Sequence, residues 1–450
     1  MRSTAIKAEA DSSTVETLTT TDPGRDASPN PLTFRSSISW SFAGTFVYAA
    51  CQWASLVVLA KLSSPETVGT LALATAATTP IFMLCNLQLR AIQATDAKGK
   101  YSFPTIAFLR LTTTSLALIG IGGYITLFSK ERTLSLVIAS IAISKALESF
   151  SDSIHGRLQL YNRQDLIAKS MATKGALNLA LLSIAYSLTH NLAFSAGCLA
   201  VSSLIPLIAF DARALRRLHS ETAKPPDQFR ISPEFRPNEL RSLLSSAIPL
   251  GITMMLVSLN LNVPRYAIEA FLDRHALGIY AALAQLIAVG SLVISSIGQA
   301  AAPRLARLHH AGNDRAFHRL YRSLQIFAVS LSAIGLLLSL AFGEWIVAFI
   351  FRPEYASHAD LLGLLSVSGG LAYASSVTGY ALTAAGVHRA QAPLYALVLL
   401  VGAASSITLT PIMGLHGVAV GLILSNSFQF ACASIVLRRG LSSLHKIGVH

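Results

Sequence analysis

The sequence predicts an all-α, polytopic membrane protein with twelve transmembrane helices in two six-helix bundles. Three observations carry this prediction: twelve apolar stretches long enough to cross a bilayer, a charged fraction of only 13%, and a bias of Lys and Arg toward alternate loops. About 20 predominantly apolar residues make one helical crossing, whereas soluble domains carry about 25% charged residues. The bilayer is therefore expected to be the solvent for most of this chain.

Each crossing is assigned from a continuous apolar run that is bounded by charged or turn-forming residues. The fourth and fifth runs carry ionisable residues and are less apolar than the others. The predicted crossings are residues 36–60, 68–89, 104–128, 133–153, 166–188, 191–210, 242–263, 276–301, 324–343, 359–385, 391–411 and 415–437.

The segments outside these crossings divide the chain into five parts. Residues 1–35 are rich in Ser, Thr and Asp and lack the apolar core of a signal peptide, so a disordered cytoplasmic tail is expected. Residues 211–241 contain four prolines and form the longest loop. This cytoplasmic linker separates a bundle over residues 36–210 from a second bundle over residues 242–438. Residues 439–450 follow as a second cytoplasmic tail.

Lys and Arg are distributed unevenly between the two sides of the predicted membrane. If the chain begins inside, the cytoplasmic loops and the C-terminal tail contain 21 of them and the outer loops contain six. Basic residues favour the cytoplasmic side, so both termini are predicted to be cytoplasmic, with the protein in a bacterial inner membrane. The net charge of +13 then reflects loops that face anionic lipid, and no nucleic-acid partner is expected.

Two short segments, 209 residues apart, resemble one another. Val-Gly-Thr-Leu-Ala-Leu-Ala at residues 68–74 and Leu-Gly-Ile-Tyr-Ala-Ala-Leu at residues 277–283 occupy matching places at crossings two and eight. Because each half has an even number of crossings, the repeat is expected to be parallel, about an axis along the membrane normal. Transporters use such repeats, with the substrate path between the halves.

The fourth crossing carries Lys145, Glu148 and Asp152, whose spacings of three and four place them on one helical face. The fifth carries Lys169 and, deeper, Lys174. Ionisable side chains inside a membrane are costly and need a reason. One interpretation is the charged lining of a wet cavity, with a carboxylate such as Asp152 holding Lys174. The other is a set of salt bridges that joins the two helices. Glu148 and Asp152 are also candidates for coupling to an ion gradient.

Further candidate residues lie nearer the membrane surfaces. Arg90 follows the second crossing and either binds a phosphate through its guanidinium or anchors the loop. Arg110, about one turn inside the third crossing, is expected to snorkel to the surface. Asn260, Asn262 and Arg265 form a polar patch at the predicted outer end of the seventh crossing. The amides either bind sugar hydroxyls or join helices, and Arg265 either holds a phosphate or anchors the helix.

The sequence contains no motif of a catalytic or metal site. There is no HExxH or GxSxG motif, and the segment that ends at Gly99 and Lys100 lacks the first glycine of a phosphate-binding loop. The four cysteines lie inside predicted crossings without CxxC spacing, so they indicate neither disulfides nor zinc. A protein that is not an enzyme and has no cofactor or metal is therefore expected.

Several segments resemble the polysaccharide-export, O-antigen-type flippases of lipid-linked oligosaccharides in the MOP (multidrug/oligosaccharidyl-lipid/polysaccharide) exporter superfamily, which is MATE-like. The resemblance covers residues 36–438. It is carried by Leu-Ser-Ser-Pro-Glu-Thr-Val-Gly at 62–69, Leu-Gly-Ile-Tyr at 277–280, Asn-Leu-Gln-Leu-Arg at 86–90, and the segment 145–152 with Gly156 and Gln159.

This resemblance implies a V of two bundles around a central cavity. It also implies movement of a polyprenyl-pyrophosphate-linked oligosaccharide to the outer leaflet for lipopolysaccharide or exopolysaccharide synthesis, with polymerase and glycosyltransferase partners. Cationic residues line that cavity in the family, which fits Lys145, Lys174, Arg90 and Arg265. The chain departs from the lipid II branch, which usually has two further C-terminal helices. Its first crossing also lacks the acidic residue of some ion-coupled drug exporters.

Two alternatives stay open on the sequence. One is a MATE-like exporter of cationic drugs, whose cavity is expected to be acidic and aromatic, whereas the candidate residues here are mostly basic. The other is a non-transporting assembly partner of a polysaccharide synthase, in which polar substitutions within the crossings would be tolerated as long as packing is preserved.

Overall fold

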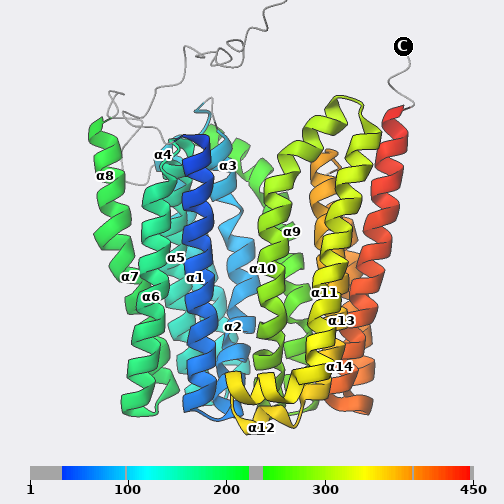
Figure 1. Ribbon diagram of the computed structural model, residues 1–450. Helices are drawn as coiled ribbons and strands as arrows, with labels where there is room; N and C mark the ends of the chain where they lie inside the picture. The colour runs from blue at the N-terminus through cyan, green and yellow to red at the C-terminus, as the bar shows by residue number, and fades with distance from the viewer. Residues whose placement is uncertain (1–32, 97–98, 222–236, 388–389, 446–450) are drawn as a thin grey trace, which may run out of the picture.

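The computed structural model of the protein describes residues 33–96, 99–221, 237–387 and 390–445. The regular secondary structure of these residues is entirely helical (Figure 1), which confirms the predicted fold class. The helices are α1 (Phe34–Leu62), α2 (Pro65–Asn86), α3 (Leu89–Thr95), α4 (Phe103–Phe128), α5 (Arg132–Leu160), α6 (Gln164–Thr189), α7 (Leu192–Pro206), the π-helix η1 (Leu207–Asp211), α8 (Ala212–Glu221), α9 (Pro237–Phe271), α10 (Arg274–His310), α11 (Asp314–Ile350), α12 (Pro353–Ala356), α13 (Ala359–Ala384) and α14 (Gln391–His445).

Ten helices of the described chain are long and apolar enough to cross a membrane. Helix α6 is not among them because polar residues, including Lys174 and Asn178, interrupt its apolar run. Helix α14 holds two crossing segments, since the backbone at Gly414 (φ 58°, ψ −135°) is not helical. With α6 included and α14 divided at Gly414, the described residues agree with the predicted twelve crossings.

Local sequence determines where these helices begin. Each backbone polar group in hydrocarbon must be satisfied inside the protein, which favours long helices. The first turns are capped by polar side chains: Asp273 accepts a hydrogen bond from the Ala276 amide at 2.7 Å, and Asn191 accepts one from the Phe194 amide at 3.1 Å. Pro65 occupies the first turn of α2, where its missing N–H costs nothing.

The helices form two bundles, α1–α8 and α9–α14 (Figure 1). In the first, α1 packs against α6, and α5 packs against α4 and α7. In the second, α13 packs against α10, α11 and α14, and α9 packs against α14. Large apolar side chains such as Ile119, Leu340 and Ile412 are exposed on the outside, as expected where lipid is the solvent.

Helix α2 makes most of the contacts between the bundles, through α9 and α10. Gly69 lies against the carbonyl oxygen of Arg274, and Gly278 lies against that of Pro65. A Cβ at either glycine would overlap the facing carbonyl, so the absence of a side chain permits this approach of backbone to backbone. The contact lies at the ends of α2 and α10 opposite to the side on which α1 begins (Figure 1).

Several predicted boundaries were wrong. Helix α9 begins at Pro237 and continues through Pro249 and Pro264 to Phe271, so the predicted end of this crossing at residue 263 lies inside the helix. The predicted linker includes helix α8, and α14 continues beyond residue 438. Proline does not end the helix at these positions. In membrane helices, neighbouring helices and polar side chains can satisfy the backbone carbonyl groups that proline leaves without a hydrogen bond. Residues 1–32, 222–236 and 446–450, which belong to the predicted tails and linker, lie outside the described residues.

Candidate functional site

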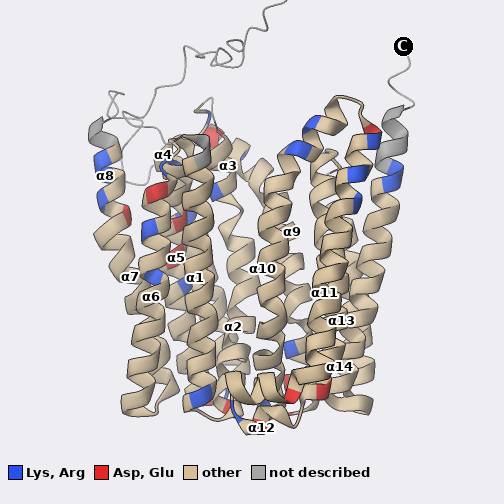
Figure 2. Cartoon of the chain, in the orientation of Figure 1, with Lys and Arg blue, Asp and Glu red and all other residues tan. Residues whose placement is uncertain are grey.

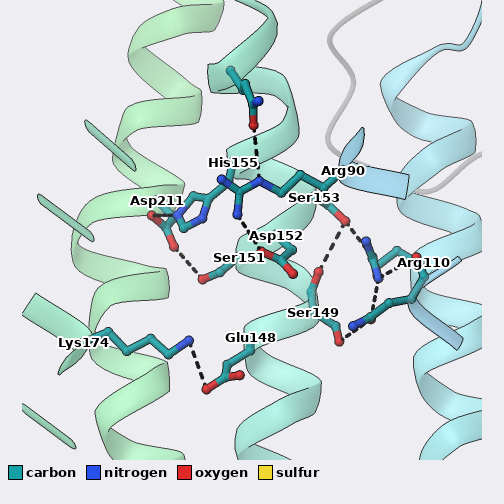
Figure 3. A network of polar contacts seen from close by, with 12 residues as sticks. Arg90, Arg110, Glu148, Ser149, Ser151, Asp152, Ser153, His155, Lys174 and Asp211 are labelled. Carbon is teal, nitrogen blue, oxygen red and sulfur yellow. Dashed lines mark hydrogen bonds and ion pairs between the residues drawn. The ribbon is translucent and has the colours of Figure 1, made fainter. Parts of the chain in front are cut away.

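Helix α5 carries a row of polar side chains into the interior of the first bundle. Figure 2 shows charged residues of both signs within α5 and α6, away from the helix ends. Glu148 and Asp152 lie along α5 in Figure 3, together with the serines at positions 149, 151 and 153. The continuous helix confirms the spacing argument that placed Lys145, Glu148 and Asp152 on one face.

Lys174 on α6 is paired with Glu148. Its Nζ lies 3.0 Å from Glu148 Oε1 (Figure 3) and 5.0 Å from the centre of the Tyr48 ring on α1. The expectation that Asp152 holds Lys174 was therefore wrong, because Glu148 lies one turn closer to it. The alternative of a salt bridge between the two helices is correct for this lysine, and the tyrosine adds a cation–π contact.

Asp152 instead contacts Arg90 on α3. Arg90 Nη1 lies 3.2 Å from Asp152 Oδ1, and Arg90 Nε lies 3.4 Å from Gln159 Oε1. Helix α3 starts after a break at Leu87 and Gln88, whose φ angles of 50° and 51° are left-handed, and this break brings Arg90 over α5. Both members of the ion pair keep a third or more of their side-chain surface exposed, so Arg90 is accessible to a ligand and its pairing with Asp152 is weak.

Arg110 does not snorkel, contrary to the prediction. Only 1% of its surface is exposed. Its Nη1 donates to Asn86 Oδ1 at 2.6 Å and to the Asn86 carbonyl at 3.3 Å, and its Nε donates to Ser153 Oγ at 2.9 Å. Ser149 Oγ donates to the same Asn86 Oδ1 at 2.8 Å. Arg110 therefore caps the end of α2 and joins α2, α4 and α5 (Figure 3).

Lys145 and Arg265 have no bonded carboxylate among the described residues, unlike Lys174 and Arg90. Within the part of the chain that the structure describes, Lys145 makes no ion pair or side-chain hydrogen bond. Arg265, from the second bundle, donates to Asn262 Oδ1 at 3.0 Å. Both side chains are half-buried. One half-buried cation from each bundle is thus left without a bonded carboxylate among the described residues.

The other predicted candidates have structural partners. Lys169 Nζ lies 5.6 Å from the centre of the Trp40 ring on α1. Asn262 Nδ2 donates to the Ser258 carbonyl at 2.8 Å, and Asn260 lies against Gly402 of α14. The patch formed by Asn260, Asn262 and Arg265 lies inside α9 rather than at its end.

A buried His–Asp pair was missed by the sequence analysis. His155 Nε2 lies 3.1 Å from Asp211 Oδ1, and Ser151 Oγ donates to Asp211 Oδ2 at 2.5 Å (Figure 3). Asp211 is 1% exposed and belongs to η1, yet it was assigned to the first position of the linker. An acidic residue directly after an apolar run that contains Pro206 was the available signal. This pair ties α5 to the π-helical turn.

A second polar cluster lies where α2 meets α10. Arg274 at the start of α10 is paired with Glu131 of the first bundle and, at 3.3 Å, with Glu269 of α9. Arg352 Nη1 donates to the Ser63 carbonyl at 2.9 Å, again between the bundles. A groove of about 410 Å³ adjoins this cluster and is lined by residues of both bundles, including Tyr124 and Glu269.

Solved structures with this fold are transporters. The chain matches an inward-facing multidrug resistance MATE family transporter of the MOP superfamily with a TM-score of 0.65 and 14% identity, over 93% of this chain and 97% of that one. It matches a MOP superfamily transporter from Pyrococcus furiosus, described as having a binding pocket of reverse polarity, with a TM-score of 0.64 and 15% identity, over 91% and 96% of the chains. The fold class is therefore that of MATE-like, multi-pass membrane transporters.

The family follows from the sequence comparisons. Residues 34–309 match the model of the family described as polysaccharide biosynthesis protein. The capsular polysaccharide biosynthesis protein CapF of Staphylococcus aureus is 25% identical over 391 residues, which cover 86% of this chain and 95% of that protein. The chain belongs to the polysaccharide biosynthesis protein family, and its fold is that of transporters of the MOP superfamily.

Proposed function

We propose that this chain is a flippase, not an enzyme, that moves a polyprenyl-pyrophosphate-linked oligosaccharide from the inner to the outer leaflet of a bacterial inner membrane. The observation that carries the proposal is the pair of half-buried cations, Lys145 and Arg265, which lie in opposite bundles and have no bonded carboxylate among the described residues. The family membership supplies the polysaccharide context.

A pyrophosphate is the ligand that these two cations fit best. A charge buried at membrane depth is costly unless it is paired, and neither cation is bonded to a carboxylate among the described residues. A dianion placed between them would relieve both penalties at once. The planar guanidinium of Arg265 can donate two hydrogen bonds to phosphate oxygens in a bidentate arrangement, while the ammonium of Lys145 acts as a point charge. The polyprenyl tail stays in the lipid, toward which the exposed apolar side chains of the bundles would face.

The Lys174–Glu148 pair provides a route to coupling. A phosphate that enters beside Lys145 competes with Glu148 for the Lys174 ammonium, which lies 3.0 Å from the carboxylate. Protonation of Glu148 would free Lys174 for the anion. Asp152 and Arg90 stand in the same relation nearer the surface, where their pair is partly exposed. In this proposal the carboxylates hold the lysine and arginine in place between transport cycles.

The proposed cycle alternates access between the two bundles. The contact of α2 with α10 and the pairing of Arg274 with Glu131 close one side. In the orientation that the bias of Lys and Arg favours, that closed side is outside and both termini are cytoplasmic, and the proposal takes this structure as an inward-open state. Rocking of one bundle against the other would then expose the anion to the outer side. Glycosyltransferase partners would act before this step, and a polymerase partner would act after it.

The test is a flipping assay in proteoliposomes. The probe is a fluorescent polyprenyl-diphosphate-linked monosaccharide whose outer-leaflet copies are bleached by a membrane-impermeant reductant. Lys145→Met and Arg265→Met are each expected to slow flipping at least about tenfold, which corresponds to about 1.4 kcal/mol. Lys145→Arg keeps the charge and should retain most of the rate. The matched control is Arg438→Met, which removes an exposed cation at the end of α14.

Three outcomes would contradict the proposal. Normal flipping by both Met variants would remove the role of the cation pair. Export of a cationic dye but not of the lipid probe by the native chain would indicate a MATE-like drug exporter. The third outcome combines two results: the folded native protein transports nothing, and cells that lack the protein lose their surface polysaccharide. Together these results would indicate an assembly partner of a polysaccharide synthase.

A further inference from the structure

The exposed face of α11 carries a basic groove that plays no part in the proposed transport path. The groove has a volume of about 490 Å³ and contains no carboxylate in its lining. It lies at the end of α11 on the side where α1 begins, and Figure 2 shows several Lys and Arg residues at that end of the second bundle. Its lining residues, all exposed, are Arg315, His318, Arg319, Arg322, Ser323 and Ile326.

The groove residues share one helical face. Their spacings of three and four place them in a row along α11, and the opposite face packs through Phe317 and Leu324 into the core of the second bundle. The row therefore points away from the protein. Between Ile326 and Gly343 the exposed residues of α11 are apolar except Ser330, and the large ones include Phe327, Val329, Ile334, Leu337, Leu338 and Leu340.

The length of this apolar surface indicates where the groove lies relative to the membrane. From Ile326 to Trp345, which is also exposed, a helix rises about 28 Å, close to the roughly 30 Å of bilayer hydrocarbon. Exposed tryptophan is typical of the membrane interface. Arg322 and Arg319 then lie about 6 and 10 Å above the hydrocarbon edge, in and just above the headgroup layer, which is about 5–8 Å thick on each side.

We propose that this face of α11 is a binding site for an anionic phospholipid of the leaflet on that side, with a preference for a headgroup that carries two phosphates. Guanidinium groups on successive turns bind phosphate oxygens in pairs, and basic pockets at this level of a membrane bind polyanionic headgroups. The acyl chains lie along the apolar residues below. The apolar continuation of the same face is the reason to assign a lipid rather than a soluble anion or an acidic protein.

The experiment measures lipid retention and needs no transport. Native mass spectrometry of the purified full chain in detergent would count bound cardiolipin, phosphatidylglycerol and phosphatidylcholine after equal additions. The test variant is Arg319→Gln with Arg322→Gln. The matched control is Arg213→Gln with Arg216→Gln, which removes two exposed arginines from α8 at the same side of the membrane. We expect the α11 variant to lose at least about tenfold in cardiolipin affinity and the control to change less than about twofold.

Other results would overturn the proposal. Equal losses in the two double variants would show that cardiolipin responds only to total positive charge. Retention that is the same for cardiolipin and phosphatidylcholine would show that the groove does not recognise phosphate. If millimolar inorganic pyrophosphate displaced cardiolipin, and the groove bound pyrophosphate as tightly as it binds cardiolipin, the groove would be assigned to a soluble ligand. Because binding is measured directly, failure here leaves the flippase proposal untouched, and loss of flipping in the Lys145 variants leaves this site untouched.

Discussion

Gly69 and Gly278 make equivalent contacts in the two halves of the chain. Gly69 lies against the carbonyl of Arg274, and Gly278 lies against the carbonyl of Pro65, so that each glycine meets the residue four positions before its counterpart. Both pairs of equivalent residues, Pro65 with Arg274 and Gly69 with Gly278, are separated by 209 positions. The short sequence echo therefore marks a two-fold contact between the bundles, at the point where α2 and α10 close one side of the molecule.

Enlarging either glycine is expected to open this side. A methyl group at Gly69 or Gly278 would overlap backbone, and overpacking of this kind costs about 1–3 kcal/mol. The cost falls on the closed arrangement alone, so Gly69→Ala and Gly278→Ala should lengthen the distance between spin labels at Ser187 and Glu344, near the ends of α6 and α11 at the closed side. The control is Gly335→Ala on α11, where no atom lies within 4 Å of a built Cβ. An unchanged distance distribution in both variants would show that the contact does not depend on the missing side chains.

The Arg274–Glu131 pair is expected to act as a latch on the same side. Glu131→Gln removes the charge that holds Arg274 to the first bundle, while the bond of Arg274 to Glu269 remains within the second. The population in which the bundles are separated at the closed side should rise modestly, since partly exposed ion pairs contribute about 0–1 kcal/mol. Glu354→Gln is the matched control, because its partner His275 belongs to the same bundle. Equal shifts in the two variants, measured by the same spin-label distances, would mean that no bond between the bundles is involved.

The sequence predicts those features of the fold and the site that depend on local interactions, and it fails where tertiary packing decides. Hydropathy and length gave the twelve crossings, and the distribution of basic residues gave their proposed orientation. The helical spacing correctly placed Glu148 on the face of Lys145. It did not identify the partner of Lys174, because the rotation of α6 against α5 depends on packing with α1. Arg110 was misjudged for a similar reason: its partner Asn86 becomes available only where α2 breaks before two left-handed residues.

Loss of Arg110 is expected to destabilise the first bundle strongly. Arg110→Met removes hydrogen bonds at 2.6 and 2.9 Å to Asn86 and Ser153 and leaves buried polar atoms without partners, at about 1–3 kcal/mol for each orphaned group. Arg90→Met removes only a partly exposed pair and should cost about 0–1 kcal/mol. Thermal unfolding in detergent would compare them. A melting temperature for Arg110→Met as high as that of Arg90→Met would show that the cap on α2 is not structural.

The Lys174–Glu148 pair is best tested by a double-mutant cycle that separates stability from transport. Lys174→Met leaves Glu148 charged and half-buried without its ion-pair partner, and Glu148→Gln does the reverse, so each single variant should be less stable than the double variant Lys174→Met with Glu148→Gln. The physical reason is that removing both charges also removes the cost of burying one alone. If Lys174 also binds the travelling pyrophosphate, the double variant should regain thermal stability but keep the slow flipping of Lys174→Met. Recovery of both stability and flipping in the double variant would limit the pair to a structural role and leave Lys145 and Arg265 as the anion site.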